Sequence, residues 1–250
     1  MKKDLRILIY SLVVIGVFLM LAGSCKKSDN NPDSGTSSGT VKDIDGNVYH
    51  TVTIGTQVWM VENLKTTKYR DGSPIPNVTD DNAWGSLSNT ITGAYCSYNN
   101  DAALGIKYGK LYNWYAVNDS RNIAPTGWHI PSDAEWETLK IYLAANLGTS
   151  GSVAKALAAT TDWPSSNVSG AIGNDLTKNN PTGFTALPGG ARGRFIGDFS
   201  IGRSGIWWSS SEYDNNHALY RLIAFDWGGL DKDYYEGGKN NGFSIRCVRD

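Results

Sequence analysis

The sequence is poor in the residues on which several classes of protein depend. Its 250 residues include 3 cysteines, too few for a disulfide scaffold or a thiolate zinc site. The formal net charge is -1 at pH 7, so the chain lacks the basic excess that nucleic-acid binding requires. The 28 glycines follow no triplet period and no heptad repeat is sustained, which excludes collagen-like and coiled-coil structures.

Recognisable catalytic motifs are also missing. The chain has no phosphate-binding loop, nucleophile elbow or HExxH zinc motif. The three histidines are scattered at His50, His129 and His217, and we interpret His129 as structural. A hydrolase would need two paired carboxylates, and the candidates are Asp198, Glu212, Asp214 and Asp226. Because nothing in their spacing favours pairing, we expect a protein that is not an enzyme and that uses no metal or cofactor.

What the sequence does contain is enough aromatic mass for a folded core. It has 9 Trp and 13 Tyr, and hydrophobic residues make up 40% of the chain. The length allows a targeting segment followed by one large domain, or two small domains.

Residues 1–25 have the layout of a secretory signal. Basic residues lie near the start, an apolar run covers 7–21, and small residues at 22–24 precede Cys25. The run of about 15 residues is short for a membrane-spanning helix, which needs about 20. The small residues before Cys25 resemble the lipobox of bacterial lipoproteins, in which that cysteine is lipidated; the alternative is an uncleaved anchor. We therefore predict a lipoprotein signal over 1–25, with Cys25 as the lipid attachment site.

Residues 26–40 are polar and rich in Ser, Gly, Asn and Asp, and we predict a flexible tether there. Together these segments place the protein in the cell envelope, attached to a membrane through its lipid. We expect attachment to the outer membrane, and the sequence leaves open whether the protein lies on its periplasmic or its external face.

From residue 41 onward the pattern predicts one α+β domain. Alternating residues on both sides of Gly55-Thr56 predict a β-hairpin. Before it, Asp43, Asp45 and Asn47 imitate the start of a calcium loop, but no acidic residue closes the loop, so we expect a tight turn. Residues 65–105 are predicted to be mostly irregular, because Pro, Asn and Asp are frequent there.

Three helices are expected, over 109–117, 132–147 and 152–159. The second is the clearest, because Ser132 and Glu135 have the spacing of a capping box and apolar residues recur on one face. The last third of the chain predicts short strands at 206–208, 218–225 and 243–248, joined by turns rich in Gly and Asn.

Six ordered motifs then indicate a family. They are IGTQVWMVENLK, GKLYNWYAVND, PTGWHIPSDAEWETL, GFTALPGGARG, WWSSSEY and GFSIRCVRD. Over about 43–250 the chain resembles the Fibrobacter succinogenes major paralogous domain, which is common in lipoproteins of Bacteroidetes-type bacteria. The resemblance implies a fold like that of C-type lectins and of sulfatase-modifying factors, with two main helices, a small irregular antiparallel sheet and long loops. It implies no settled activity.

Departures from these relatives limit what the resemblance implies. The formylglycine-generating relatives hold copper with two cysteines, whereas this chain has only Cys247 in the corresponding region. The calcium-binding tripeptides of true lectins are absent. Relatives commonly carry a cysteine where this chain has Ala124, so Cys247 has either lost its partner or pairs with Cys96. Such a disulfide would close a loop of about 150 residues, worth roughly 4–5 kcal/mol.

The strongest functional hypothesis is a binding module that uses its C-terminal strands and loops. Tyr and Trp offer rigid contact area and Asn offers adaptable hydrogen bonds. The candidate ligand-binding residues are Tyr213, Asn215, Asn216, His217, Tyr220, Arg221, Trp227, Tyr234, Tyr235, Asn240 and Asn241. The ligand would be a glycan or a protein of the envelope or cell surface. A structural or adhesion component without a small ligand is the alternative, and hydrolysis a weaker one.

Overall fold

The computed structural model describes residues 39–147, 152–193, 201–233 and 238–250. The predicted signal, Cys25 and nearly all of the tether lie outside the described residues, as do Tyr234 and Tyr235. Thr36–Asp250 forms a compact unit of its own. None of the helices in the described ranges has both the length and the apolar character needed to cross a membrane.

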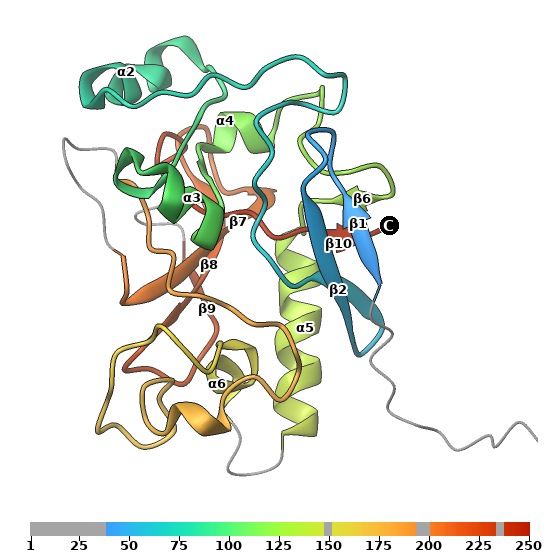
Figure 1. Ribbon diagram of the computed structural model, residues 1–250, viewed down its shortest axis with the longest axis vertical. Helices are drawn as coiled ribbons and strands as arrows, with labels where there is room; N and C mark the ends of the chain where they lie inside the picture. Colours follow the sequence, from blue (N-terminus) through green and yellow to red (C-terminus); the bar gives the residue numbers. More distant parts are fainter. Residues whose placement is uncertain (1–38, 148–151, 194–200, 234–237) are drawn as a thin grey trace, which may run out of the picture. The chain divides into compact units, whose positions relative to one another are not determined.

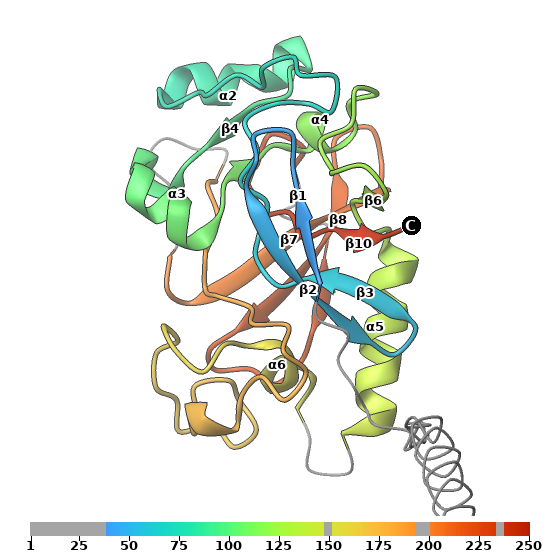
Figure 2. The same ribbon diagram turned by 45° about the vertical axis from the view of Figure 1, so that its right-hand side comes forward.

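The first sheet brings the two ends of the domain together (Figures 1 and 2). Its order is β1-β2-β3-β10-β6, and every described pairing in it is antiparallel. The strands are β1 (Thr40–Lys42), β2 (Val48–Ile54), β3 (Gln57–Met60), β6 (Trp128–His129) and β10 (Val248–Arg249). The predicted hairpin is confirmed: Ile54 pairs with Gln57 across a turn in which Gly55 has a φ of 62°. The C-terminal strand joins this sheet because Val248 lies between Trp59 and His129.

The turn before the hairpin is built by Asp43. Its carboxylate accepts hydrogen bonds from the backbone N–H groups of Asp45 and Asn47, and from the hydroxyl of Tyr49 at 2.6 Å. The carboxylate that imitates a calcium ligand thus closes a tight turn, as expected.

The remaining strands form two further sheets, so the single small sheet that we expected is divided. β4 (Tyr95–Cys96) pairs with β5 (Leu111–Tyr112), and β7 (Ser204–Glu212), β8 (Ala218–Ala224) and β9 (Asp231–Asp233) lie in that order. Of the strand predicted at 243–248, only its last residue is in β10. Phe243 and Ser244 instead make single bridges to Tyr112 and Trp207, because they pass between sheets rather than along one.

The predicted helix at 132–147 is confirmed as α5 (Asp133–Asn146), and its capping box is complete. The Ser132 side chain accepts from the backbone N–H of Glu135, and the Glu135 carboxylate accepts from the N–H of Ser132 at 2.8 Å. The buried face carries Trp136, Leu139 and Leu143. Each contributes roughly 1.5–3 kcal/mol by leaving water. Trp136 packs against Trp59 with the ring centroids 4.7 Å apart, which joins α5 to the first sheet.

Two helices lie where an irregular region was expected. α2 (Asp81–Thr90) begins at Asp80, whose side chain accepts from the N–H of Ala83, and α3 (Ala102–Tyr108) begins at Asp101 in the same way. The sequence of α2 is poor in strong helix formers, and its buried residues are Trp84 and Leu87. Tertiary packing of these two side chains therefore overrides weak local propensity.

The other predicted helices are shorter than expected. In place of a helix over 109–117, residues 111–112 form β5, and α4 (Trp114–Val117) begins after Asn113. The Asn113 side chain caps α4 by accepting from the N–H of Ala116. The predicted helix at 152–159 is α6 (Val153–Leu157), which Ser152 caps. Two 3₁₀ turns complete the described elements, at Tyr98–Asn100 and Leu176–Lys178.

The candidate disulfide is not formed: Cys96 and Cys247 are both free, buried thiols. Cys96 packs with Trp84 and Leu111, whereas Cys247 packs with Tyr49 and Met60 in a different hydrophobic cluster. The separation follows from the fold, since β4 pairs with β5 while Cys247 precedes the C-terminal strand of the first sheet. Burial raises the pKa of the Cys96 thiol to about 11, and it raises that of Cys247 still further.

Candidate functional site

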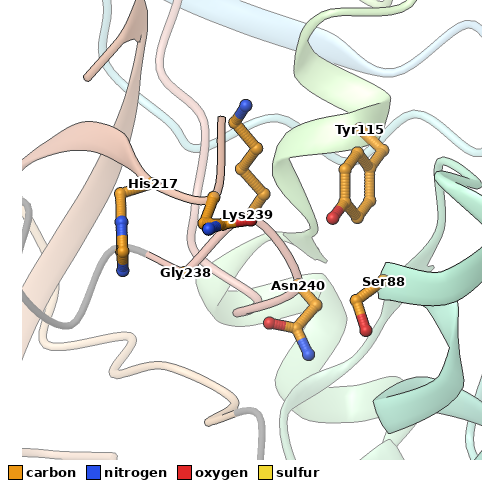
Figure 3. Close-up of a pocket in the computed structure, with 7 residues that line it drawn as sticks. Ser88, Tyr115, His217, Gly238, Lys239 and Asn240 are labelled. Atoms are coloured by element: carbon orange, nitrogen blue, oxygen red, sulfur yellow. The ribbon is translucent and has the colours of Figure 1, made fainter. Parts of the chain in front are cut away.

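An open hollow of about 510 Å³ lies where α2, α4 and two C-terminal loops meet (Figure 3). Its walls are formed by Ser88, Tyr115, Asn216, His217, Gly238, Lys239 and Asn240. A second hollow of about 420 Å³ shares four of these residues and continues along α4 toward Asp119 and Glu212. We call the two hollows together the amide pocket, because asparagine side chains, among them those of Asn215, Asn216 and Asn240, lie along it.

One wall is the tight turn that follows β7. Oδ1 of Asp214 accepts from the backbone N–H groups of Asn216 and His217, both at 2.8 Å. The His217 ring nitrogen Nδ1 lies 2.9 Å from the same oxygen. The hydrogen bond from the Asn216 backbone is the main reason that the pKa of Asp214 is lowered. A carboxylate that closes its own turn in this way leaves Asn215 and Asn216 exposed at the tip.

The floor of the amide pocket is organised by Lys239. Its backbone N–H donates to Asn216 and its carbonyl accepts from Trp114, so the lysine ties the turn to α4. Its ammonium donates to the carboxylate of Glu212 and, at 2.8 Å, to the carbonyl of Asn215. The same ammonium lies 4.8 Å from the centre of the Trp114 ring. Only 7% of the Lys239 side chain is exposed, compared with 50% for Glu212.

The opposite wall is α2, which Trp84 attaches to the C-terminal loop. The indole N–H of Trp84 donates to the carbonyl of Asn240 at 2.7 Å. Arg192 covers the Trp84 ring at 4.4 Å and pairs with Asp81 at the start of α2. These contacts place Ser88, near the end of α2, beside Asn240 and Tyr115, as Figure 3 shows.

Several neutral polar groups at the amide pocket have no partner within the described ranges. They are the hydroxyl of Tyr115 and the side-chain amides of Asn215, Asn216 and Asn240. Burial raises the pKa of the Tyr115 phenol, so the hydroxyl keeps its proton at neutral pH. An amide can donate and accept at once, and a phenol can do the same. The arrangement therefore suits a ligand with many hydroxyl groups.

The structure brings together four of the predicted ligand-binding residues and separates the others. Asn215, Asn216, His217 and Asn240 line the amide pocket. Tyr213 is half exposed on the same turn. Trp227 is 54% exposed but follows β8, whereas the turn that carries Asn215, Asn216 and His217 precedes that strand. A seven-residue strand spans about 23 Å, so Trp227 belongs to another part of the surface.

The prediction of ligand binding is wrong for three residues, because their side chains are buried. They are Tyr220, Arg221 and Asn241. The Tyr220 ring packs edge-on against Trp208, with the centroids 6.4 Å apart. The Arg221 guanidinium pairs with Asp133 and Glu137 on α5. Both faces of β8 are therefore covered, one by α5 and the other by aromatic rings, and neither side chain is available to a ligand.

Sequence reasoning missed Ser88, Tyr115 and Lys239 as site residues. Ser88 and Tyr115 lie far from the C-terminal loops in sequence, and no local pattern connects them. Lys239 precedes a predicted site residue, but only tertiary structure shows its pairing with Glu212, which we had considered only as a hydrolytic carboxylate.

We also looked for a metal site and for paired hydrolytic carboxylates in the described residues. Across those ranges there is no group of three or more His, Cys, Asp and Glu side chains arranged for a metal ion. Of the carboxylates considered for hydrolysis, Glu212 pairs with Lys239 and Asp214 closes a turn. Asp226 follows β8 at its other end, and Asp198 lies outside the described residues.

His129 takes a structural position, as expected. Its Nε2 lies 2.7 Å from Glu135 at the start of α5, and its Nδ1 lies 2.6 Å from the side chain of Asp250. Burial acts to lower the pKa of His129, but the hydrogen bonds to Asp250 and Glu135 outweigh it, so the pKa is raised.

The fold and the pocket define an α+β domain with an open, amide-rich hollow between α2, α4 and the C-terminal loops. Residues 52–249 match the family described as the Fibrobacter succinogenes major domain, and the chain belongs to this family. No curated protein matches the chain, and no solved structure does.

Proposed function

We propose that this protein is a lipid-anchored binding module of the cell envelope that recognises a glycan in the amide pocket. One observation carries the proposal: unpaired amides and a phenol surround an open hollow with an aromatic side chain in its wall. Sugar hydroxyls both donate and accept hydrogen bonds, as these groups do, and the apolar faces of sugar rings pack on aromatic rings.

The anchor and the fold type belong to the same proposal. Attachment through Cys25 at the outer membrane rests on the signal-like segment, and a fold like that of C-type lectins rests on the sequence resemblance. Replacing Cys25 with Ser is expected to abolish acylation and release the protein from the membrane fraction. Unchanged partitioning of that variant would refute the lipid anchor.

A surface protein is the second candidate ligand, and the rim of the pocket favours it. Ile91 is 72% exposed beside the amide pocket, and Tyr213 is 50% exposed on the turn opposite. Exposed apolar side chains bordered by polar residues are typical of protein contacts. Affinity capture from envelope extracts that recovers a stoichiometric protein would favour this ligand.

The glycan proposal is tested with a glycan array and residues 36–250, which form a compact unit. Tyr115→Ala, Asn216→Ala and Asn240→Ala should each weaken binding about fivefold or more, because each removes one or two hydrogen bonds worth about 1 kcal/mol. Asn167→Ala is the matched control, since Asn167 is an exposed loop residue that is absent from the pocket walls. Binding that survives all three pocket substitutions would refute this site.

A further inference from the structure

We propose that the amide pocket selects uncharged, hydroxyl-rich glycans, and that the ion pair between Glu212 and Lys239 sets this selectivity. The inference rests on the function proposed above, because it names the class of ligand for the same pocket. It follows from the hydrogen bonds and ion pairs that the charged groups around the pocket already make within the protein.

Among the described residues that line the pocket, Lys239 carries the only ammonium, and this group has little capacity left for an anion. It donates to Glu212 and to the Asn215 carbonyl at 2.8 Å, and its remaining side faces the Trp114 ring at 4.8 Å. A lysine ammonium has three N–H donors in all. With 7% of its side chain exposed, Lys239 cannot meet an anionic ligand without leaving Glu212.

The carboxylates around the pocket are engaged as well. Oδ2 of Asp119 pairs with Nη2 of Arg121 at 2.6 Å. Asp214 accepts from two backbone N–H groups and lies against the ring of His217. Opposite charges as close as those of Asp119 and Arg121 cancel most of each other's field at ligand distance. An acidic glycan would therefore lose part of its hydration without gaining a cation.

The hydrogen-bonding capacity that remains is neutral. It belongs to the Tyr115 hydroxyl and to the amides of Asn215, Asn216 and Asn240, which have no partner in the described part of the chain. Such groups satisfy hydroxyls and leave carboxylates or sulfates uncompensated. The geometry therefore points to neutral sugars.

The test measures the affinity of residues 36–250 for polysaccharides by electrophoresis in gels that contain the polymer. Neutral probes are dextran, mannan and xylan, and anionic probes are dextran sulfate and polygalacturonate. We expect the wild-type protein to be retarded by at least one neutral polymer and bound more weakly by the anionic polymers. Glu212→Gln leaves the charge of Lys239 uncompensated, so binding to anionic polymers should tighten about fivefold and the gain should fall with added salt.

Two variants control for net charge and for shape. Glu62→Gln changes the net charge by the same amount, but Glu62 pairs with His50 and is absent from the pocket walls. Glu212→Asp keeps the carboxylate and should keep the neutral selectivity. Glu212 is half exposed, and thermal melting checks that each variant is folded.

Three outcomes would overturn the inference. Tighter binding of the wild-type protein to anionic than to neutral polymers would refute the selectivity and leave the glycan-binding proposal standing. Equal gains in Glu212→Gln and Glu62→Gln would show an effect of net charge and remove the role of the ion pair. Failure of every polymer to retard the protein would reject the proposed glycan-binding function, and the inference with it.

Discussion

Asn63 offers the sharpest test of how the core is held together. It is 5% exposed, and its Oδ1 accepts hydrogen bonds from Nε and Nη2 of Arg246, at 3.2 and 2.8 Å. The same oxygen accepts from the indole N–H of Trp207 at 2.8 Å. Arg246 is fully buried between Phe184 and Trp207, and burial lowers the pKa of its guanidinium to about 9. One neutral amide oxygen therefore supports a buried cation and a buried indole.

Replacing Asn63 with Ala leaves both of these groups without their acceptor. A lost hydrogen bond to a charged group costs about 1.5–3 kcal/mol, and an unsatisfied neutral donor costs about 1–3 kcal/mol. We therefore expect Asn63→Ala to lower the free energy of unfolding by about 4 kcal/mol. At 2–4 °C for each kcal/mol in a domain of this size, the melting temperature should fall by roughly 10 °C.

The variant Asn63→Asp tests the role of the acceptor oxygen separately from that of the amide N–H donors. It keeps an oxygen for Arg246 and Trp207 but loses the amide donations to the Tyr108 carbonyl at 2.8 Å and to the Ser244 hydroxyl at 3.2 Å. Its cost should be about 2 kcal/mol, the usual value of two hydrogen bonds. Asn179→Ala is the matched control, because Asn179 is buried and its Oδ1 has no partner.

The measurement is denaturant unfolding of residues 36–250, followed by tryptophan fluorescence and circular dichroism. If Asn63→Ala and Asn63→Asp are equally destabilising, the oxygen is not what holds Arg246, and the reasoning fails. It also fails if Asn63→Ala costs no more than Asn179→Ala.

Three further predictions concern other parts of the fold. The raised pKa of His129 stabilises the fold fully below about pH 6.5, and this contribution is lost as the pH rises through the folded pKa. His129→Gln should remove that part of the pH dependence of unfolding, and an unchanged profile would contradict it. Because burial raises the pKa of both thiols, Cys96 and Cys247 should resist alkylation in the native protein and both react after unfolding without reductant; a mass matching a disulfide would disprove this. Trp84→Phe removes the hydrogen bond to the Asn240 carbonyl and should cost about 1 kcal/mol of stability, while weakening ligand binding through the pocket loop. Normal binding by that variant would show that α2 does not position the loop.

Where local chemistry is sufficient, the structure agrees with the sequence-based predictions. The hairpin at Gly55 and the capping box of α5 are confirmed, because each depends on residues close together in the chain. The family was also recognisable, since its motifs are short and ordered. α2 was missed because its propensity is weak and the burial of Trp84 decides its conformation.

Tertiary structure decided which of the predicted site residues are exposed and which are buried. Strand alternation suggests that either Tyr220 or Arg221 faces solvent, but α5 covers one face of β8 and aromatic rings cover the other. The structure likewise placed Cys96 and Cys247 in separate clusters, although the sequence had left a bridge between them open.

The sequence by itself determined the family, the α+β class and the local caps and turns, because these depend on neighbouring residues and short motifs. The amide pocket, in contrast, exists only after folding. Ser88, Tyr115 and Asn216 come from separate segments, and long-range contacts such as the one between Trp84 and Asn240 bring those segments together. Packing decides which polar residues face the pocket, and it also brings Glu212 to Lys239, whose charge it neutralises. No local sequence pattern predicts either result.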